Sequence, residues 1–263
     1  MKRTLLTIVV ALAISVVAQA QETVKHMLVK HIDGTETSIP VSDVYEVTFV
    51  DKVTAFVPKP FSVSDSQKVY FSPGNLQYQA STDTWRFAEH QYDIIGEEND
   101  KISESYDGWI DLFGWGTGDN PTMSTEEGSQ YSPFVDWGKH INDGDTWFTL
   151  TMEQWEYFYK NHEHKMTTVH GMPGCVFLPD EATVSINAHW YDLEAAGALF
   201  LPSAGYRWGL SSCNFGYGGV YWSSTPEGPE DANGMYFGTY VTTAINGRYT
   251  GQSIRLVRLV QDE

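Results

Sequence analysis

Histidine and carboxylate side chains are the groups with which this sequence could bind a metal ion. His162, His164 and His170 lie close together along the chain, but side chains two residues apart point to different sides of a helix, and no His-Glu-x-x-His run accompanies them. Asp143-Gly144-Asp145 and the acidic run 227–231 also lack the residue spacing of a calcium loop. We therefore expect the histidines at a frayed, solvated helix end, the acidic segments in solvated turns, and no bound metal.

The sequence contains few motifs that indicate nucleophilic or acid–base catalysis. The sequence contains no Gly-x-Ser-x-Gly turn and no cysteine beside a histidine. Its 34 Asp and Glu residues do not single out a pair for glycoside hydrolysis. The glycine-rich run from Gly114 to Asp119 resembles a phosphate-binding loop, but Asn120-Pro121 follows where that motif requires a helix, so we expect a turn. The sequence predicts no catalytic residue and no cofactor.

Aromatic residues make up 14% of the chain, and this high content is the most informative feature of its composition. They provide flat apolar area at low entropic cost, which suits stacking on sugars or filling pockets of a protein partner. Most tryptophans should lie in the core, whereas side chains in the Gly- and Asn-rich turns near the C-terminal strands are better candidates for a binding surface. These candidates are Trp208, Asn214, Tyr217, Tyr221, Tyr240, Asn246, Arg248 and Tyr249.

The charge balance and the first 20 residues indicate where the protein acts. A formal net charge of −18 would repel a phosphate backbone, which excludes nucleic acid as a partner. Residues 1–20 combine Lys2 and Arg3, an apolar run and the end Ala18-Gln19-Ala20, a pattern typical of a cleaved secretory signal. The apolar run is shorter than the roughly 20 residues that cross a bilayer. We expect an exported protein, in the periplasm or at the cell surface or outside, with no membrane span after cleavage.

Cys175 and Cys213 are the only cysteines in the chain. An exported protein with an even number of cysteines can form a disulfide, and this bridge would contribute about 4 kcal/mol in the chain-entropy model. The alternative is two buried, unpaired thiols that act as small apolar residues. The sequence leaves both alternatives open.

Residues 21–52 are expected to form a small β module, followed by a linker over residues 53–60. Val24 to His31 and Glu36 to Ile39 flank Asp33-Gly34, which is a hairpin signal, and a further apolar segment runs from Val44 to Val50. Pro58 and Pro60 disfavour both helix and strand in the linker.

Residues 61–263 are predicted to form one α+β domain of two helices and short antiparallel strands. A helix is expected over Met152 to Asn161, because Thr151 and Gln154 match a capping box. A second is expected between Asn187 and Ala196, stopped by Gly197. Asn246-Gly247 favours a tight turn between the last two strands, and residues 95–147 should form a long structured loop region. The expected strands are Lys68–Phe71, Leu76–Gln79, Thr84–Ala88, Ala198–Leu201, Val220–Ser224, Met235–Thr243 and Ser253–Leu259.

Several motifs resemble a recurrent secreted bacterial family. They are FSPGNLQY from Phe71, GWIDLFGWG from Gly108, GALFLPSAGYR from Gly197, YWSST from Tyr221 and GQSIRLVR from Gly251. The stretch from about Phe61 to Val260 is similar to the Fibrobacter succinogenes major paralogous domain group, which is abundant in Bacteroidetes. This resemblance implies a C-type lectin-like fold, related to formylglycine-generating enzymes and to the variable ligand-binding proteins of diversity-generating retroelements. Such motifs are specific for the family and poorly specific for activity.

Within the resembling motifs, Trp222 should be a core ring whose following hydroxyls bond neighbouring backbone. Arg255 and Arg258 should tie the closing strand to acidic loops. The cysteine placement does not reproduce that of formylglycine-generating enzymes, and the Glu-Pro-Asn and Gln-Pro-Asp tripeptides of calcium-dependent lectins are absent.

These features favour a secreted or cell-surface, non-catalytic binding protein that recognises a glycan or a protein through aromatic and amide side chains on its late loops. One alternative is a cell-envelope enzyme acting on a polysaccharide or a sulfated substrate. Another is a structural subunit of a surface assembly, with residues 24–50 as the docking piece.

Overall fold

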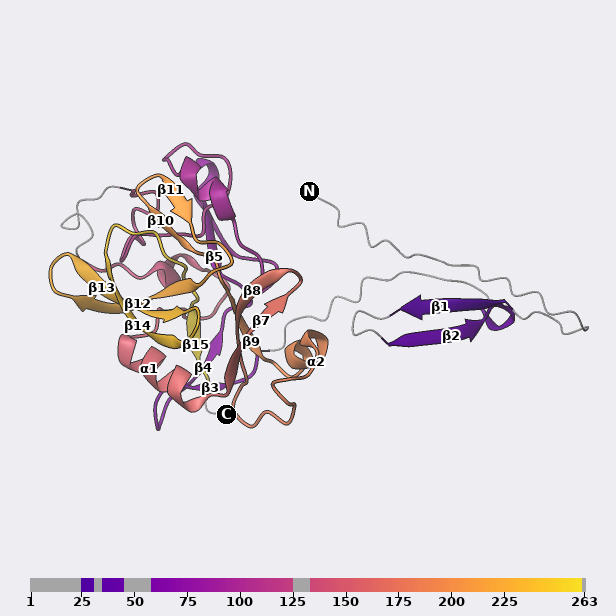
Figure 1. Cartoon of the computed structure of the whole chain (residues 1–263). Helices are drawn as coiled ribbons and strands as arrows, with labels where there is room; N and C mark the ends of the chain where they lie inside the picture. The colour runs from indigo at the N-terminus through magenta and orange to yellow at the C-terminus, as the bar shows by residue number, and fades with distance from the viewer. Residues whose placement is uncertain (1–24, 31–34, 45–57, 125–132, 262–263) are drawn as a thin grey trace, which may run out of the picture. The chain divides into compact units, whose positions relative to one another are not determined.

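The computed structural model describes residues 25–30, 35–44, 58–124 and 133–261 (Figure 1). The chain divides into two compact units, Met1–Val53 and Thr54–Glu263. This division falls at the start of the predicted linker over residues 53–60. The predicted signal at residues 1–20, the Asp33-Gly34 turn and the segment beyond Val44 lie outside the described residues.

The described part of the first unit is a strand pair. β1 (His26–Lys30) runs antiparallel to β2 (Glu36–Pro40), from His26↔Pro40 to Lys30↔Glu36. A 3-10 turn, η1 (Val41–Asp43), follows β2. These strands confirm the two halves of the predicted hairpin, each within a residue or two of the expected bounds.

The second unit mixes two α-helices with short antiparallel strands, which confirms the α+β class. The helices are α1 (Met152–Asn161) and α2 (Trp190–Ala195), and the 3-10 turns are η2 (Ala80–Thr82), η3 (Gly96–Lys101) and η5 (Trp137–His140). The strands are β3 (Phe61–Ser62), β4 (Lys68–Phe71), β5 (Leu76–Gln79), β6 (Thr84–Phe87), β7 (His164–Val169), β8 (Met172–Phe177), β9 (Leu199–Pro202), β10 (Tyr206–Trp208), β11 (Ser211–Cys213), β12 (Gly219–Glu227), β13 (Asp231–Phe237), β14 (Val241–Gly247) and β15 (Val257–Leu259). They pair into the small sheets β15-β4-β3, β5-β6, β7-β8-β9, β10-β11 and β12-β13-β14.

Helix α1 begins and ends where the sequence predicts. The Thr151 hydroxyl accepts a hydrogen bond from the Gln154 backbone N–H at 3.2 Å, and the Gln154 side chain accepts one from the Thr151 N–H at 2.8 Å. This reciprocal capping box satisfies two of the free N–H groups at the helix start. Trp155 and Phe158 then lie on one side of the helix and are fully buried.

The β12-β13-β14 sheet separates two apolar clusters. Tyr221, Met235 and Phe237 pack on the α1 side with Trp155. Trp222 and Ala232 lie in a different cluster, because successive side chains of a strand point to opposite faces. Helix α1 contacts all three strands of this sheet.

The loop region over residues 95–147 is structured in its described parts, as predicted. Phe113, Trp115 and Trp137 are buried in the same cluster as Trp222. The Trp222 indole N–H donates to the Phe113 carbonyl at 2.8 Å, and the Trp115 indole N–H donates to the Ser223 carbonyl at 2.8 Å. Trp222 is therefore a core ring, as expected, and it anchors this loop region to β12.

The late strands differ from the prediction in two places. The segment Met235–Thr243 is not one strand but parts of β13 and β14, which reverse over residues 238–240 with Phe237 opposite Val241. Asn246-Gly247 is not a tight turn, because both residues pair with β13 inside β14. Tertiary pairing has overridden the local turn preference here.

The closing segment joins the start of the second unit. β15 pairs with β4, which pairs with β3, and the Val260 N–H donates to the Lys68 carbonyl at 3.1 Å. Before β15, Ser253 forms an isolated bridge with Tyr221, and residues 254–256 are buried outside any strand, in place of the longer predicted strand. Among the described residues, no helix is both long and apolar enough to cross a membrane.

The two arginines of the closing segment differ from each other. Arg258 approaches Asp145 at 3.2 Å, as predicted for a tie to an acidic loop. Arg255 is buried and donates instead to the carbonyls of Ser72 at 3.1 Å and Phe200 at 2.9 Å. The prediction is therefore wrong for Arg255. Its guanidinium satisfies backbone carbonyl oxygens of buried residues and does not bind an acidic loop.

Candidate functional site

A hollow lies on the face of the β12-β13-β14 sheet that is opposite α1. Ala244 of β14 lines it; Ala244 pairs with Gly234 of β13, a buried glycine that pairs on its other side with Trp222 of β12. Tyr236 and Asn246 lie two residues further along their strands and project to the same face. A Cβ atom at Gly234 would lie 2.8 Å from the Tyr221 carbonyl oxygen, so a larger residue does not fit there.

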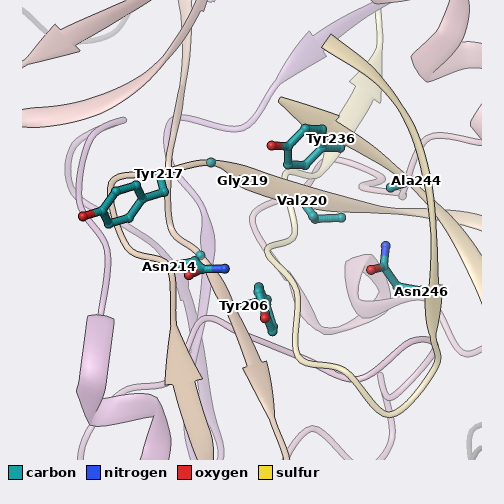
Figure 2. Close-up of a pocket in the computed structure, with 10 residues that line it drawn as sticks. Tyr206, Asn214, Tyr217, Gly219, Val220, Tyr236, Ala244 and Asn246 are labelled. Carbon is teal, nitrogen blue, oxygen red and sulfur yellow. The ribbon is translucent and has the colours of Figure 1, made fainter. Parts of the chain in front are cut away.

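The hollow is a pocket with a cavity volume of about 230 Å³ (Figure 2). Figure 2 shows Tyr236 and Tyr206 on opposite sides of it, Asn246 on a third side, and Asn214 with Tyr217 across from Asn246. The lining consists of glycine, small apolar, tyrosine and asparagine residues. They are Gly205, Tyr206, Asn214, Tyr217, Gly218, Gly219, Val220, Tyr236, Ala244 and Asn246.

The turns beside the pocket need unusual backbone conformations. Gly205 has φ +67°, and a Cβ atom there would collide with the Cys213 carbonyl oxygen. Asn214 also has a left-handed conformation, with φ +62°, which asparagine tolerates better than most residues. These two positions hold Tyr206 and Asn214 at the pocket wall.

The pocket offers polar groups but no formal charge. None of its ten lining residues is acidic or basic. The Asn246 amide nitrogen Nδ2 is buried and finds no hydrogen-bond partner in the described structure. Leaving a buried donor unsatisfied costs about 1–3 kcal/mol, so a ligand oxygen that reached this amide would supply a hydrogen bond that the protein does not.

A tyrosine and a thiol interact at the pocket wall. Tyr206 is directly opposite Cys213 in the β10-β11 pair, and a hydrogen bond with the Cys213 side chain raises the pKa of Tyr206 above its usual value. The Tyr206 hydroxyl therefore stays protonated at neutral pH and is able to donate or accept a hydrogen bond.

Six of the eight predicted binding residues lie in or near this pocket. Asn214, Tyr217 and Asn246 line it. The other three flank it. The ring centre of Tyr240 lies 6.3 Å from that of Tyr236, a lining residue. Trp208 lies two residues beyond Tyr206 on β10, and its ring centre lies 5.0 Å from that of Tyr249.

Tyr221 is wrongly predicted as a surface residue. Its exposed fraction is 0%, because alternation along β12 turns it toward α1. Its hydroxyl lies within hydrogen-bond distance of Asn75 Oδ1 at 3.1 Å and the Pro202 carbonyl at 3.3 Å, and burial raises its pKa to about 12.

Arg248 is also wrongly predicted as a surface residue. It is buried, with its guanidinium 4.3 Å above the centre of the Trp115 ring. It donates to the carbonyls of Asp231 at 3.1 Å and Gly228 at 2.6 Å. Arg248 therefore holds the β12-β13 turn against the loop region.

Sequence reasoning missed Tyr206, Tyr236 and the small residues beneath them. The spacing Gly234-x-Tyr236 on β13 and Ala244-x-Asn246 on β14 places a small residue beside a large one on each strand. That signal is readable only once the pairing register is known, because a shift by one residue would turn every side chain to the other face.

The two cysteines are free thiols. Cys175 lies in β8 within the apolar cluster under α1, and burial raises its pKa to about 12. Cys213 is half-buried in β11. Of the two alternatives left open by the sequence, the structure has the unpaired one.

The three histidines do not form the predicted solvated helix end. His162 is buried at the end of α1, His164 lies in β7, and His170 is at the β7-β8 turn with φ +48°. The His162 ring nitrogens lie 2.8 Å from the Phe158 carbonyl oxygen and 2.8 Å from Asp180 Oδ1. Burial explains the error, since an apolar cluster surrounds the end of α1.

Asp180 gathers several donors in addition to His162. It accepts hydrogen bonds from the Ser62 hydroxyl at 2.7 Å and from Lys68 Nζ at 2.8 Å. Burial acts to raise the pKa of Asp180, but the hydrogen bonds from Lys68, Ser62 and His162 outweigh it and hold the pKa well below its usual range. This cluster ties β3 and β4 to α1 and is fully satisfied, in contrast to Asn246.

The other candidate chemistry lies elsewhere in the fold. Within the described residues, no group of three or more His, Cys, Asp or Glu side chains could hold a metal ion. The run Gly114 to Asp119 is a turn, with Gly116 at φ +69°. Asp143 accepts a hydrogen bond from the Trp147 indole at 2.9 Å, so the Asp143-Gly144-Asp145 segment is part of a structural turn.

The pocket therefore combines aromatic ring area, amide groups and a buried donor that lacks a partner in the described structure, beside a three-stranded sheet. Comparisons with protein-family models, with curated proteins and with solved structures find no match for this chain.

Proposed function

We propose that this protein is an exported, non-catalytic binding protein whose second unit is a C-type lectin-like domain. Its ligand, a glycan or a loop of a protein partner, enters the pocket between Tyr206 and Tyr236. The single observation that carries this proposal is the uncharged pocket with the buried, unpartnered Nδ2 of Asn246. A few fixed polar groups in a concave, mostly apolar site are the usual features of a binding pocket.

Three further features support the proposal. The motifs that resemble the Fibrobacter succinogenes major paralogous domain group span most of the second unit, whose two helices and short antiparallel strands agree with that fold. The first 20 residues have the pattern of a secretory signal. The Tyr217 side chain is 84% exposed and extends away from the cavity (Figure 2), so its ring is available to a part of the ligand that lies outside the pocket.

The alternative of a cell-envelope enzyme draws no support from this pocket. Polysaccharide hydrolases use a pair of carboxyl groups that flank the scissile bond, and the lining holds no Asp or Glu. A hydrolase and sulfatase screen on the purified protein distinguishes the two functions, since turnover by the wild-type protein would contradict the non-catalytic role.

The pocket itself is tested by filling it. Ala244→Leu adds a branched side chain at the pocket floor, whereas Thr243→Leu adds a similar side chain on the opposite, exposed side of the same strand. On a glycan array, and in a pull-down from the envelope fraction, we expect wild type and Thr243→Leu to bind a saturable ligand and Ala244→Leu to lose it. Equal binding by Ala244→Leu, or no saturable ligand for wild type in either assay, would contradict the proposal.

A further inference from the structure

Five aromatic rings form a path that passes through the pocket. Tyr236 and Tyr206 are its two pocket walls. From Tyr236 the path continues to Tyr240, whose ring centre lies 6.3 Å away. From Tyr206 it continues to Trp208 and then to Tyr249, whose ring centre lies 5.0 Å from that of Trp208. We call this set, Tyr240, Tyr236, Tyr206, Trp208 and Tyr249, the aromatic path.

The strand geometry explains why the path leaves the pocket on the Trp208 side. Arg207 is fully buried and donates to the Leu112 carbonyl at 3.3 Å. Alternation along β10 therefore turns Tyr206 and Trp208 outward together. The two rings lie on the same side of one strand, and the path extends beyond the cavity.

Several large apolar side chains of the segment that carries this path are exposed. In the described part of the second unit, eight such side chains are exposed; four of them, Trp208, Leu210, Tyr217 and Tyr240, come from β10 and the turns near the pocket, while Ile245 points to the opposite side of β14 from Ala244 and Asn246. Trp208 is 50% exposed and Tyr240 is 64% exposed. A concentration of exposed aromatic side chains marks an interaction surface more strongly than scattered ones do.

The chemistry of the pocket favours uncharged ligand groups that carry oxygen acceptors. Its cavity of about 230 Å³ is below the roughly 300 Å³ of sites for drug-sized ligands, so it holds a single ring. Asn246 Nδ2 has no acceptor in the described structure, and a sugar hydroxyl that reached it would provide one. The net charge of −18 repels an acidic polymer at long range.

We infer that the pocket and the aromatic path bind an uncharged polysaccharide along its length. One sugar residue occupies the pocket, and its neighbours in the polymer stack on Tyr240 in one direction and on Trp208 and Tyr249 in the other. This inference rests on the proposed function and narrows it from any glycan or protein to a neutral polysaccharide chain. It also states that the site binds an internal segment and not a chain end alone.

The inference is tested by titration calorimetry with neutral oligosaccharides of one to six residues, from glucan, mannan and galactan, and with oligogalacturonates of the same lengths. For the neutral polymer that binds, we expect affinity to rise at least tenfold between one and about four residues, and the acidic series to bind more weakly. Tyr240→Ala and Trp208→Ala should each weaken the longer oligosaccharides about fivefold and leave the single sugar unchanged. Ala244→Leu should abolish binding at every length.

Tyr191→Ala is the matched control, because Tyr191 is a half-exposed tyrosine on α2 and outside the path. It should bind all lengths as wild type does, and thermal unfolding should show that every variant is folded.

The outcomes separate the path from the pocket. Affinity that does not change with length, while Ala244→Leu still abolishes binding, would overturn the path and leave the proposed function standing. Tighter binding of the acidic series, or binding of a protein partner but of no neutral oligosaccharide, would also overturn the inference and leave a binding pocket. Binding by Ala244→Leu equal to wild type would contradict both.

Discussion

The β12-β13-β14 sheet has two faces that use the same strands in opposite ways. On the α1 face, large side chains such as Tyr221 and Met235 fill the space completely, and Trp155 of the helix donates to the Trp222 carbonyl at 3.2 Å. The opposite face, the pocket face, is divided. Trp222 and Ala232 are buried there in a second apolar cluster, whereas Val220, Tyr236, Ala244 and Asn246 line the pocket. The α1 face therefore contributes packing alone, while the other face combines packing with a buried donor that has no partner in the described structure. The difference teaches that a small residue such as Ala244 beside larger ones leaves room for a pocket on a face that is otherwise part of the core.

The largest expected effect is on the α1 face. Trp155→Ala should lower the free energy of unfolding by about 3–5 kcal/mol, the usual cost of removing a buried tryptophan. Trp155 is fully buried and contacts Phe71 and Phe158. Urea unfolding, followed by fluorescence or circular dichroism, measures this change in the free energy of unfolding. A loss below 1 kcal/mol would show that the α1 face does not carry the stability assigned to it.

The second prediction is the loss of stability at alkaline pH that follows from the burial of Tyr221 on the α1 face. Burial raises its pKa to about 12, so the hydroxyl ionises in the unfolded chain first, and stability is lost as the pH rises above 10. By pH 12 this loss reaches about 2–3 kcal/mol at 1.4 kcal/mol for each pKa unit.

Tyr221→Phe removes that ionisation. It should cost about 1 kcal/mol at neutral pH through lost hydrogen bonds, and the gap to wild type should shrink or reverse between pH 10 and 12. Unfolding free energies measured across this range test it, and a constant gap would contradict burial of the hydroxyl.

The pocket face should show the reverse relation between stability and binding. Asn246→Ala removes a buried amide nitrogen that has no partner in the described structure, so the free energy of unfolding should stay constant or rise by up to about 1 kcal/mol. Ligand affinity should fall about tenfold.

The matched control for this change is Asn233→Ala. Asn233 donates to Glu227 Oε2 at 3.0 Å on the exposed turn side of β13, so its loss should leave ligand affinity unchanged. Denaturant unfolding and calorimetry measure both properties, and a loss of more than 1 kcal/mol in Asn246→Ala would mean that this side chain stabilises the native state.

The smallest effect on stability is expected at the pocket mouth. Tyr217 is 84% exposed, so Tyr217→Ala should change the free energy of unfolding by less than about 0.5 kcal/mol and lower ligand affinity at least twofold. Thermal unfolding and calorimetry measure the two quantities. A large change in stability together with unchanged affinity would place Tyr217 with the core residues.

Local signals predicted the elements that depend on neighbouring residues. Thr151 and Gln154 define the start of α1 because a capping box needs no distant partner. The strands Lys68–Phe71 and Leu76–Gln79 also occur as predicted. The α+β class follows from such elements together.

The pocket could not be predicted because it depends on pairing register and on which face is buried. Tyr221 and Val220 alternate in a strand whose faces are both largely covered, so their pattern does not say which one lies beside the pocket. Asn246-Gly247 has the local preference of a turn, yet its pairing with Ala232 and Asp231 continues β14. Six of the eight predicted residues lie at the site because composition identified the right segment of the chain.

The pairing of β15 with β4 has a consequence for how the second unit can be built into larger proteins. Since Val260 hydrogen-bonds to Lys68 beside β3, the entry and exit of this fold are adjacent, and in Figure 1 they lie at the end of the unit opposite β10 and β11. A short peptide could join the two, which makes the fold suited to circular permutation and to insertion into a loop of a host protein. In either arrangement, the strand pair β10-β11 beside the proposed binding pocket would remain turned away from the point of attachment.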